Sequence, residues 1–342
     1  MRIKLTRAFS LLATLLAISA AIGTAAAGDC PGNPHALGTS RTIAVDPGEH
    51  GRIGAINYAE TLPLVDKEVV LTFDDGPRPP YTNRILDILA AQCVRATYFI
   101  VGRMAKAHPE LVRRAHQAGH TIGTHSMNHP FPFRDQGLAR SKAEIEGGIA
   151  ATAAALGDAA QLAPFFRFPG LGRTDPVEGY LGSRGLMIWS ADFPADDWRR
   201  ISAAEIVRRA LHRLEAKGKG VLLLHDIQPA TALALPTILS ELQARGYRIV
   251  HVVPATAGRP KTLTTAEAWL IHPRPKPVVP AISIAEVQDP DGNRLLKKTA
   301  VELCALMSPR RHPIKMARRR RPPEAQVAQV PEPPTPEIHA VP

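Results

Sequence analysis

One stretch, from Val69 to Pro77 with the sequence VVLTFDDGP, constrains the fold more than any other part of the chain. Five apolar or β-prone residues run without interruption and end at two adjacent aspartates and a Gly-Pro pair. A continuous run of this kind, bounded by turn residues, is typical of a strand buried on both faces. Asp74 and Asp75 would then lie at the carboxyl end of that strand, where ligands gather in α/β sheets and barrels.

The two aspartates indicate a site because adjacent carboxylates repel each other. Burying both in ionised form is unfavourable unless a cation or a proton intervenes. A metal ion would take one carboxylate as a ligand and leave the other free to act as a base. A solvated Asp-Asp-Gly turn that closes a strand would show the same residues, so the motif alone leaves both interpretations open.

The segment from residue 66 to residue 254 alternates between strand and helix patterns. The expected strands are Val69–Phe73, Ala96–Val101, Thr121–Thr124, Phe165–Phe168, Leu186–Trp189, Val221–Leu224 and Tyr247–Val253. The expected helices are Thr82–Gln92, Pro109–Ala118, Ser141–Leu156, Ser202–Lys217 and Ala230–Arg245, two of which open with an S-x-x-E capping box. The alternation predicts a parallel sheet, closed like a barrel, with helices outside it. No Gly-x-Gly-x-x-Gly follows the first strand, so no dinucleotide is expected.

Both ends of the chain differ from this alternating segment. Residues 1–27 have a basic start, an apolar run and small residues at the end, as a secretory signal has. The signal predicts export to the periplasm or the extracellular space, and an uncleaved N-terminal membrane anchor is the alternative. Residues 28–65 are predicted to be an irregular N-terminal extension. Residues 255–342 are rich in Pro and Arg and are predicted to be a largely disordered tail.

Charge and cysteines limit the classes of partner. The net charge is +11, and the segment from Arg294 to Arg321 supplies +9 of it, as ten Lys and Arg against one acid. The rest of the chain is therefore nearly neutral, and no nucleic acid is expected. The tail would contact anionic envelope polymers or lipids, or nothing. Cys30, Cys93 and Cys304 form no Cys-x-x-Cys pair, which disfavours a thiolate metal site and leaves any disulfide pairing open.

Further motifs follow the later strands. His125 and His129 would lie on one face if their segment turned helically, and with Asp75 they make two imidazoles and one carboxylate. That donor set is typical of catalytic zinc, although two surface histidines would show the same spacing. Arg167 ends a strand and has the planar fork that would orient an aspartate base. His225 ends the last long buried strand, at the same end of the sheet as the aspartate pair.

The order of these motifs resembles the polysaccharide deacetylase family, which is carbohydrate esterase family 4 or the NodB-homology domain, over residues 66 to 253. The motifs are TFDDGP at 72–77, His125-x-x-x-His129, Arg167-Phe168-Pro169, Asp197-Trp198 and Leu223-Leu224-His225. The resemblance implies a distorted (β/α) barrel. It also implies that Asp75, His125 and His129 hold zinc or another divalent metal such as cobalt.

The same resemblance implies the remaining roles. Asp74 would be the base that activates water, and Arg167 would orient it. His225 would be the acid that protonates the leaving amine, tuned by Asp197. Trp198 and Leu223 would line the pocket for the acetyl methyl group. The chemistry of amide hydrolysis adds one role to these: the backbone N–H of Gly170 would donate to the developing oxyanion.

Two departures from the family pattern affect this assignment. Gly170 stands where the family usually has an aromatic residue, so a ring that shapes the substrate site is lost while a backbone donor remains. The interval from Asp192 to Trp198 is about two residues longer than usual. It therefore stays open which of Asp192, Asp196 and Asp197 contacts the site.

The sequence therefore predicts an exported, monomeric, metal-dependent hydrolase of carbon-nitrogen bonds that removes acetyl groups, most of all N-acetyl groups, from an amino-sugar polymer or oligomer. Chitooligosaccharide and peptidoglycan are the expected substrates. One alternative is a metal amidohydrolase that acts on a small non-sugar amide. The other is an inactive carbohydrate-binding envelope protein. Such a protein would not need all five of the predicted metal ligands, base and acid, which are Asp74, Asp75, His125, His129 and His225.

Overall fold

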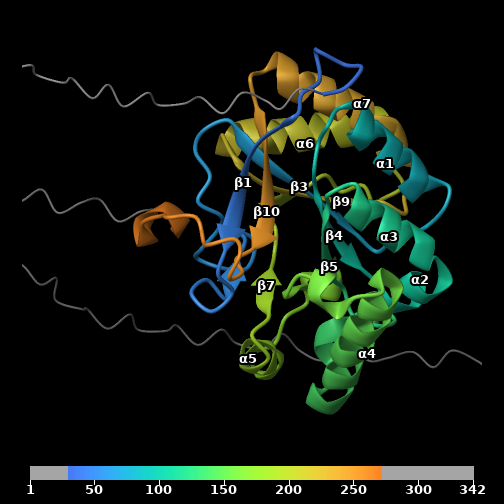
Figure 1. Cartoon of the computed structure of the whole chain (residues 1–342), viewed down its shortest axis with the longest axis vertical. Helices are drawn as coiled ribbons and strands as arrows, with labels where there is room; N and C mark the ends of the chain where they lie inside the picture. The colour runs from blue at the N-terminus through green and yellow to red at the C-terminus, as the bar shows by residue number, and fades with distance from the viewer. Residues whose placement is uncertain (1–29, 272–342) are drawn as a thin grey trace, which may run out of the picture. The chain divides into compact units, whose positions relative to one another are not determined.

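The computed structural model describes residues 30–271 of the 342-residue chain (Figure 1). The predicted secretory signal, Cys304 and the basic segment of the predicted tail lie outside the described residues. Across residues 30–271, none of the helices has both the length and the apolar character needed to cross a membrane.

In the described part of the chain, ten strands form one sheet in which all pairings between strands are parallel. They are β1 (Thr39–Val45), β2 (Arg52–Ile53), β3 (Glu68–Asp74), β4 (Thr97–Ile100), β5 (Thr121–Thr124), β6 (Phe165–Arg167), β7 (Met187–Trp189), β8 (Phe193–Pro194), β9 (Gly220–His225) and β10 (Arg248–Pro254). The main order is β1-β10-β3-β4-β5-β6-β7-β2, and β9 joins β3 to β8. The predicted parallel α/β class is confirmed.

Helices connect the strands and cover the outside of the sheet (Figure 1). They are α1 (Tyr81–Ala91), α2 (Gly102–Ala107), α3 (Pro109–Gln117), α4 (Leu138–Leu156), α5 (Asp175–Ser183), α6 (Ala203–Lys217) and α7 (Pro229–Ala244). The largest apolar core lies between α1, α6, α7 and the central strands, and it includes the fully buried Leu71, Leu235 and Ile238. Complete burial of such side chains stabilises the fold by roughly 1.5–3 kcal/mol each.

β3 is the strand predicted from the VVLTF run, and all seven of its residues are buried. It pairs with β9 along six residues and with β4 near its carboxyl end. In this register, Asp74 lies opposite His225 on β9 and opposite Phe99 on β4. The first aspartate and the candidate acid are thus held on adjacent strands at the same level of the sheet.

The segment predicted to be an irregular N-terminal extension contains two strands, β1 and β2, so the prediction that it is irregular is wrong. β1 runs beside β10 (Figure 1), and its last three residues are buried. A disulfide between Cys30 and Cys93 ties the chain ahead of β1 to the loop between α1 and β4. The TSRTIAV sequence of β1 begins with polar residues, which gave the strand only a weak apolar signal.

The predicted disordered tail begins too early, because residues 255–271 are folded. Thr256 and Arg259 form an antiparallel bridge, and Glu60 and Leu270 form another. Trp269 lies in a short 3₁₀ helix, η4 (Ala266–Trp269), and is only 3% exposed in the core cluster that contains residues of β1 and β10. One buried tryptophan therefore holds this Thr-rich segment against the sheet.

Candidate metal and catalytic site

The candidate site lies at the carboxyl ends of neighbouring strands. Asp74 ends β3 and Asp75 follows it, while His125 comes directly after β5. Arg167 ends β6 and His225 ends β9. Because β3, β5, β6 and β9 run parallel in one sheet, their carboxyl ends meet at one edge, as the sequence predicted.

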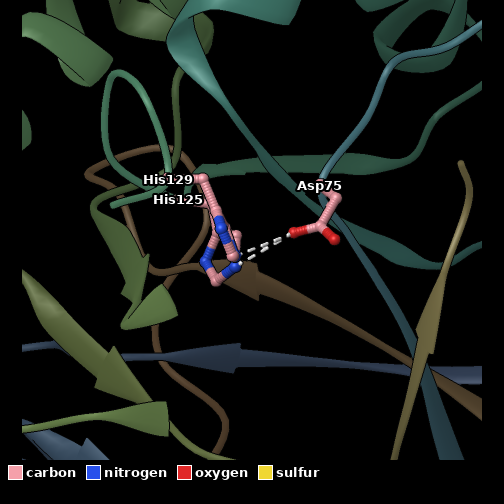
Figure 2. Close-up of side chains that lie close together, drawn as sticks. All are labelled: Asp75, His125 and His129. Atoms are coloured by element: carbon pink, nitrogen blue, oxygen red, sulfur yellow. Dashed lines mark ion pairs between the residues drawn. The ribbon is translucent and has the colours of Figure 1, made fainter. Parts of the chain in front are cut away.

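Asp75, His125 and His129 converge on one point (Figure 2). Oδ1 of Asp75 lies 3.4 Å from Nε2 of His125 and 3.3 Å from Nε2 of His129. This oxygen is buried and has no hydrogen-bond partner among the described residues. Two ring nitrogens and a carboxylate oxygen directed at one another, with the oxygen otherwise unsatisfied, fit a divalent cation with open coordination positions.

The second ring nitrogen of His125 fixes its tautomer. Nδ1 lies 2.7 Å from the backbone oxygen of Arg167. A carbonyl oxygen can only accept, so Nδ1 carries the proton and the lone pair of Nε2 is free for an ion. Arg167 therefore contributes its backbone to the metal site and its side chain to the neighbouring aspartate.

A loop, and not a helical turn, brings the two histidines together. Ser126 and His129 both have positive φ, at 65° and 56°, and Oγ of Ser126 accepts a hydrogen bond from the backbone N–H of His129. Asp75 also has a positive φ, of 80°. Non-glycine residues adopt this conformation only at a cost, and such strain clusters at binding and catalytic sites.

Electrostatic interactions favour the ionised carboxylate of Asp75 and the neutral imidazole of His129. Burial would raise the pKa of Asp75, but the surrounding imidazoles of His125, His225 and His129 outweigh it and hold the pKa well below the usual range. Burial and the nearby His125 lower the pKa of His129. An ionised carboxylate and a neutral imidazole are the forms that bind zinc.

Asp74 has a different partner from Asp75. Nη1 of Arg167 donates to Oδ1 of Asp74 at 2.7 Å and to Oγ1 of Thr72 at 2.8 Å, and Nη2 donates to the backbone oxygen of Ser190 at 2.8 Å. Arg167 is completely buried and stacks on the ring of Phe99. The buried guanidinium therefore fixes the orientation of the Asp74 carboxylate through a charge-assisted hydrogen bond.

His225 pairs with Asp197, which answers the question that the sequence left open. Nδ1 of His225 lies 2.8 Å from Oδ1 of Asp197, whose Oδ2 accepts from the backbone of His225 and from Oγ1 of Thr231. Asp192 and Asp196 lie elsewhere: Asp192 bonds the backbone of Ala55 and Val221, and Asp196 pairs with two arginines of α6. Burial would lower the pKa of His225, but the charge of Asp197 and its hydrogen bond raise that pKa to about 9.

A cavity of about 460 Å³ unites these groups. Besides its ionisable residues, its wall is apolar and includes the predicted pocket residues. The lining residues are Ile56, Asp74, Asp75, His125, His129, Phe131, Gly170, Leu171, Pro194, Trp198, Leu223 and His225. The indole of Trp198 meets the ring of His225 edge-on, with centroids 5.6 Å apart.

Phe131 is a site residue that the sequence reasoning missed. Gly170 has a φ of 57°, and a β-carbon built on it would lie 2.5 Å from the ring of Phe131. The phenyl ring therefore occupies the space that a side chain at position 170 would take, and it remains 73% exposed at the cavity. The available signal was an aromatic residue two positions after His129.

Asp226 was also missed, although it directly follows His225. It is fully buried, and Oγ1 of Thr82 donates to its Oδ2 at 2.6 Å. A β-carbon at Gly76 would lie 2.1 Å from Oδ2, so only glycine fits the turn after the aspartate pair. Burial and the charge of Asp75 raise the pKa of Asp226 to about 7, in spite of its hydrogen bonds. Asp226 thus packs against the Gly76-Pro77 turn and supports it from the buried side.

Comparison with known proteins finds similarity to deacetylases of polysaccharides. The sequence profile described as polysaccharide deacetylase matches residues 62–189. The chitooligosaccharide deacetylase of Rhizobium leguminosarum bv. trifolii is 35% identical over 202 residues, which cover 54% of this chain and 89% of that protein. The peptidoglycan-N-acetylglucosamine deacetylase PgdA of Listeria monocytogenes is 32% identical over 187 residues, which cover 55% of this chain. The match spans only 38% of the Listeria protein's own length.

Solved structures show the same likeness. The peptidoglycan deacetylase Bd3279 of Bdellovibrio bacteriovorus superposes with a TM-score of 0.55 at 32% identity, covering 64% of this chain and 60% of that chain. A Bacillus anthracis protein described as a CE4 family pseudoenzyme gives a TM-score of 0.51 at 22% identity, over 56% of this chain and 65% of that one, and is alike in fold alone. The predicted fold class and the predicted family resemblance are both confirmed.

Proposed function

The chain belongs to the polysaccharide deacetylase family, and on this premise we propose that it is a metal-dependent hydrolase that removes N-acetyl groups from an amino-sugar polymer or oligomer. One observation carries the proposal. The triad of Asp75, His125 and His129, the Arg167–Asp74 pair and the Asp197–His225 pair meet around a single cavity. The deacetylases among its relatives support peptidoglycan and chitooligosaccharide as substrate classes.

The triad supplies the metal site. A divalent cation such as zinc or cobalt, held by Asp75, His125 and His129, would polarise the acetyl carbonyl and lower the pKa of water. The cavity positions the substrate next to it, because Trp198 and Leu223 offer apolar contact for the acetyl methyl group. We assign to the backbone N–H of Gly170 a hydrogen bond to the oxyanion that develops on the carbonyl oxygen.

Asp74 is the base in this proposal. Its ionised carboxylate takes a proton from water, and the oxygen of that water forms a bond to the amide carbon. Arg167 fixes the orientation of Asp74 through the hydrogen bond from its buried guanidinium. A base held in position in this way accelerates such a step by about 10²–10⁴-fold.

His225 is the acid. Its Nδ1 is committed to Asp197, so Nε2 is the atom that can deliver a proton. With a pKa raised to about 9, the imidazole is protonated at neutral pH. As the C–N bond breaks, Nε2 gives its proton to the leaving nitrogen, and the products are acetate and a free amino sugar.

Where the protein works follows from the same proposal. The secretory signal predicted in residues 1–27 and the polymer substrates named for its relatives support a site of action in the periplasm or the extracellular space. The domain limits at residues 66 and 254, the monomeric state, and contact of the basic tail with anionic envelope polymers or lipids remain predictions.

A small non-sugar amide is the second candidate substrate. One observation favours it: apart from the ionisable residues, the 460 Å³ cavity is walled by apolar side chains and Gly170, which offer no side-chain partner to sugar hydroxyl groups. The relatives' substrates weigh more heavily, because sugar rings also bind by packing a face against aromatic residues such as Phe131 and Trp198.

Acetate release tests the proposal. The zinc-loaded protein, lacking residues 1–27, is assayed on chitin oligomers, peptidoglycan and acetylated xylan. We expect release from one amino-sugar substrate, a loss of at least about 100-fold in Asp74→Asn, and full activity in the exposed control Asp87→Asn. Equal release by wild type and Asp74→Asn would contradict the proposal. A zinc-bound wild type that is silent on all three polymers would favour the small amide.

A further inference from the structure

The candidate site has a second lobe. A cavity of about 450 Å³ adjoins the first one, and Asp75 and His129 line both. We call it the basic lobe, and its lining residues are Asp75, Arg78, Val101, Arg103, Met104, His129 and Ile227. A polymer that places its acetylated sugar at the metal triad would extend into this lobe on one side and along the apolar wall on the other.

The two lobes differ in charge. Among residues 30–271, no cationic side chain besides the histidines lines the first lobe, and its wall is apolar. The basic lobe has two arginines, Arg78 and Arg103, and a single carboxylate, Asp75, which faces the imidazoles of His125 and His129. A cation held by the triad would offset the charge of Asp75 further. The basic lobe therefore has an excess of positive charge beside the reacting group.

Neither arginine is used within the fold. Arg78 and Arg103 are exposed, and across residues 30–271 no ion pair or side-chain hydrogen bond involves either guanidinium. Of the 21 arginines in residues 30–271, twelve form ion pairs and nine do not, and Arg78 and Arg103 are the two of these nine that line the basic lobe. The two at the basic lobe are free to bind a ligand.

Both arginines stand on backbone that is fixed to the metal site. Arg78 follows the Gly76-Pro77 turn braced by Asp226, and its backbone N–H donates to Oγ1 of Thr82 at 2.8 Å. The backbone N–H of Arg103 donates to the oxygen of Met127 at 2.8 Å, inside the loop that carries both histidines. The positions of the two arginines are thus set relative to Asp75 and His129.

We propose that Arg78 and Arg103 bind a carboxylate group that the substrate carries next to its acetylated sugar, so that the enzyme prefers an anionic polymer over a neutral one. The inference rests on the proposed deacetylase function and narrows its substrate. The arginine fork matches a carboxylate with two parallel hydrogen bonds. Peptidoglycan carries carboxylates on its peptide side groups, whereas chitooligosaccharide carries none, so peptidoglycan is the substrate that fits both lobes.

The test compares two substrates in two variants. The double variant Arg78→Gln/Arg103→Gln removes both charges, and Arg95→Gln removes one exposed charge ahead of β4, at the amino end of the strands and away from the site. The value of kcat/KM is measured on peptide-bearing peptidoglycan strands and on N-acetylglucosamine oligomers of matched length. We expect the ratio of the two values to fall about tenfold in the double variant, through KM, and to stay constant in Arg95→Gln.

Salt and direct binding complete the test. Added salt should reduce the wild-type preference and leave the ratio of the double variant nearly constant, since exposed charges are screened. Equal losses on both substrates, or none on the anionic one, overturn the inference. Calorimetric binding separates this inference from the proposed deacetylase function. If the wild type releases no acetate but binds anionic strands, and the double variant does not bind them, the carboxylate-binding role of the basic lobe is supported and the deacetylase function is not. A phosphodiester-bearing glycan that competes better than peptidoglycan overturns the carboxylate assignment.

Discussion

Asp74 and Asp75 are adjacent in sequence, yet their surroundings give them different chemistry. Asp74 accepts a hydrogen bond from the guanidinium of Arg167, which fixes the orientation of its carboxylate. Asp75 meets three imidazoles, of which those of His125 and His129 can bind a metal when neutral. The change of strand conformation at Asp75, where φ is 80°, turns the second carboxylate away from the course of β3. The two roles follow from partners on β5, β6 and β9.

The Asp197–His225 pair predicts the alkaline limb of the pH–activity profile. His225 acts as an acid only while protonated, so activity falls as the pH rises through its pKa of about 9. In Asp197→Asn the carboxylate charge that raises this pKa is lost, and the alkaline limb of kcat/KM should move down by more than about one pH unit. The acidic limb should stay where it is. A profile that moves at neither limb would contradict the pairing.

Gly170 and Phe131 predict a matched pair of glycine variants. Gly170→Ala places a β-carbon against the phenyl ring at a positive φ, so it should destabilise the fold by about 1–2 kcal/mol and raise KM as Phe131 is displaced. Gly179→Ala, inside α5 with open space around it, should instead stabilise the protein by about 0.5–1 kcal/mol. Urea unfolding and steady-state kinetics measure both effects. An unchanged KM in Gly170→Ala would show that the ring takes no part in substrate binding.

The sequence predicted the ionisable residues of the site better than their supports. Asp75, His125 and His129 stand in motifs whose residue types and spacing are typical of a metal site, and the structure brings them together. Thr72, Ser190 and Thr231 hold Arg167 and Asp197 through hydrogen bonds, but hydroxyl residues and backbone carbonyls of this kind occur throughout any chain. Only the fold shows which of them matter. For the same reason, the choice among three aspartates near Trp198 required the structure.

At the scale of elements, the bounds of the predicted strands and helices lie within one residue of the observed ones, except at the start of α4. The strand β3 extends one residue beyond the predicted range at each end. It was predicted well because a continuous run of apolar residues is stable only when it is buried. The helix α4 begins at Leu138, three residues ahead of the predicted capping box. Ser141 lies inside the helix, and Glu144 instead accepts two hydrogen bonds from Asn128 in the histidine loop. The short helix α2 was missed, since six residues show too little periodicity.

Trp269 predicts how strongly the segment after β10 is bound. Its ring is buried and stacks on His50, and its Nε1 donates to Oγ1 of Thr264. Trp269→Ala should lower the free energy of unfolding by about 3–5 kcal/mol, as truncation of a buried aromatic residue does. Leu263→Ala, at a side chain that is 90% exposed in the same segment, should change it by less than about 0.5 kcal/mol. If the two variants lower the free energy of unfolding by similar amounts, residues 255–271 do not unfold together with the rest of the domain.

At the scale of the whole molecule, the metal site predicts a link between ion binding and stability. An ion that binds only the folded chain stabilises it by about 2.7 kcal/mol when its concentration is a hundred times its Kd. Zinc should therefore raise Tm, and a chelator should reverse the rise. In His129→Ala the zinc-induced shift should be largely lost, whereas His212→Ala, on the exposed side of α6, should retain it. A zinc shift of equal size in both variants would place the ion elsewhere.

Two buried histidines predict how the whole fold responds to acid. His120 precedes β5 and His251 lies on β10, where its Nε2 is 2.9 Å from Oγ1 of Thr121. Burial and nearby cationic groups lower the pKa of His120 to about 3 and that of His251 to about 4. The unfolded chain thus binds more protons than the folded one as pH falls from 6.5 toward these values, so stability is lost over that window.

At pH 5 each histidine should have removed about 2 kcal/mol from the free energy of unfolding relative to pH 7.5. Urea unfolding at the two pH values measures the loss. Between pH 7.5 and pH 5, the double variant His120→Gln/His251→Gln should lose about 4 kcal/mol less of its free energy of unfolding than wild type does. For His251→Gln alone, the loss should be smaller by about 2 kcal/mol. The hydroxyl of Thr121 donates to the backbone oxygen of Val252, so it accepts from Nε2 of His251, and an added proton would go to the buried Nδ1, which has no partner among the described residues. Equal acid sensitivity in wild type and the double variant would mean that other groups control acid unfolding.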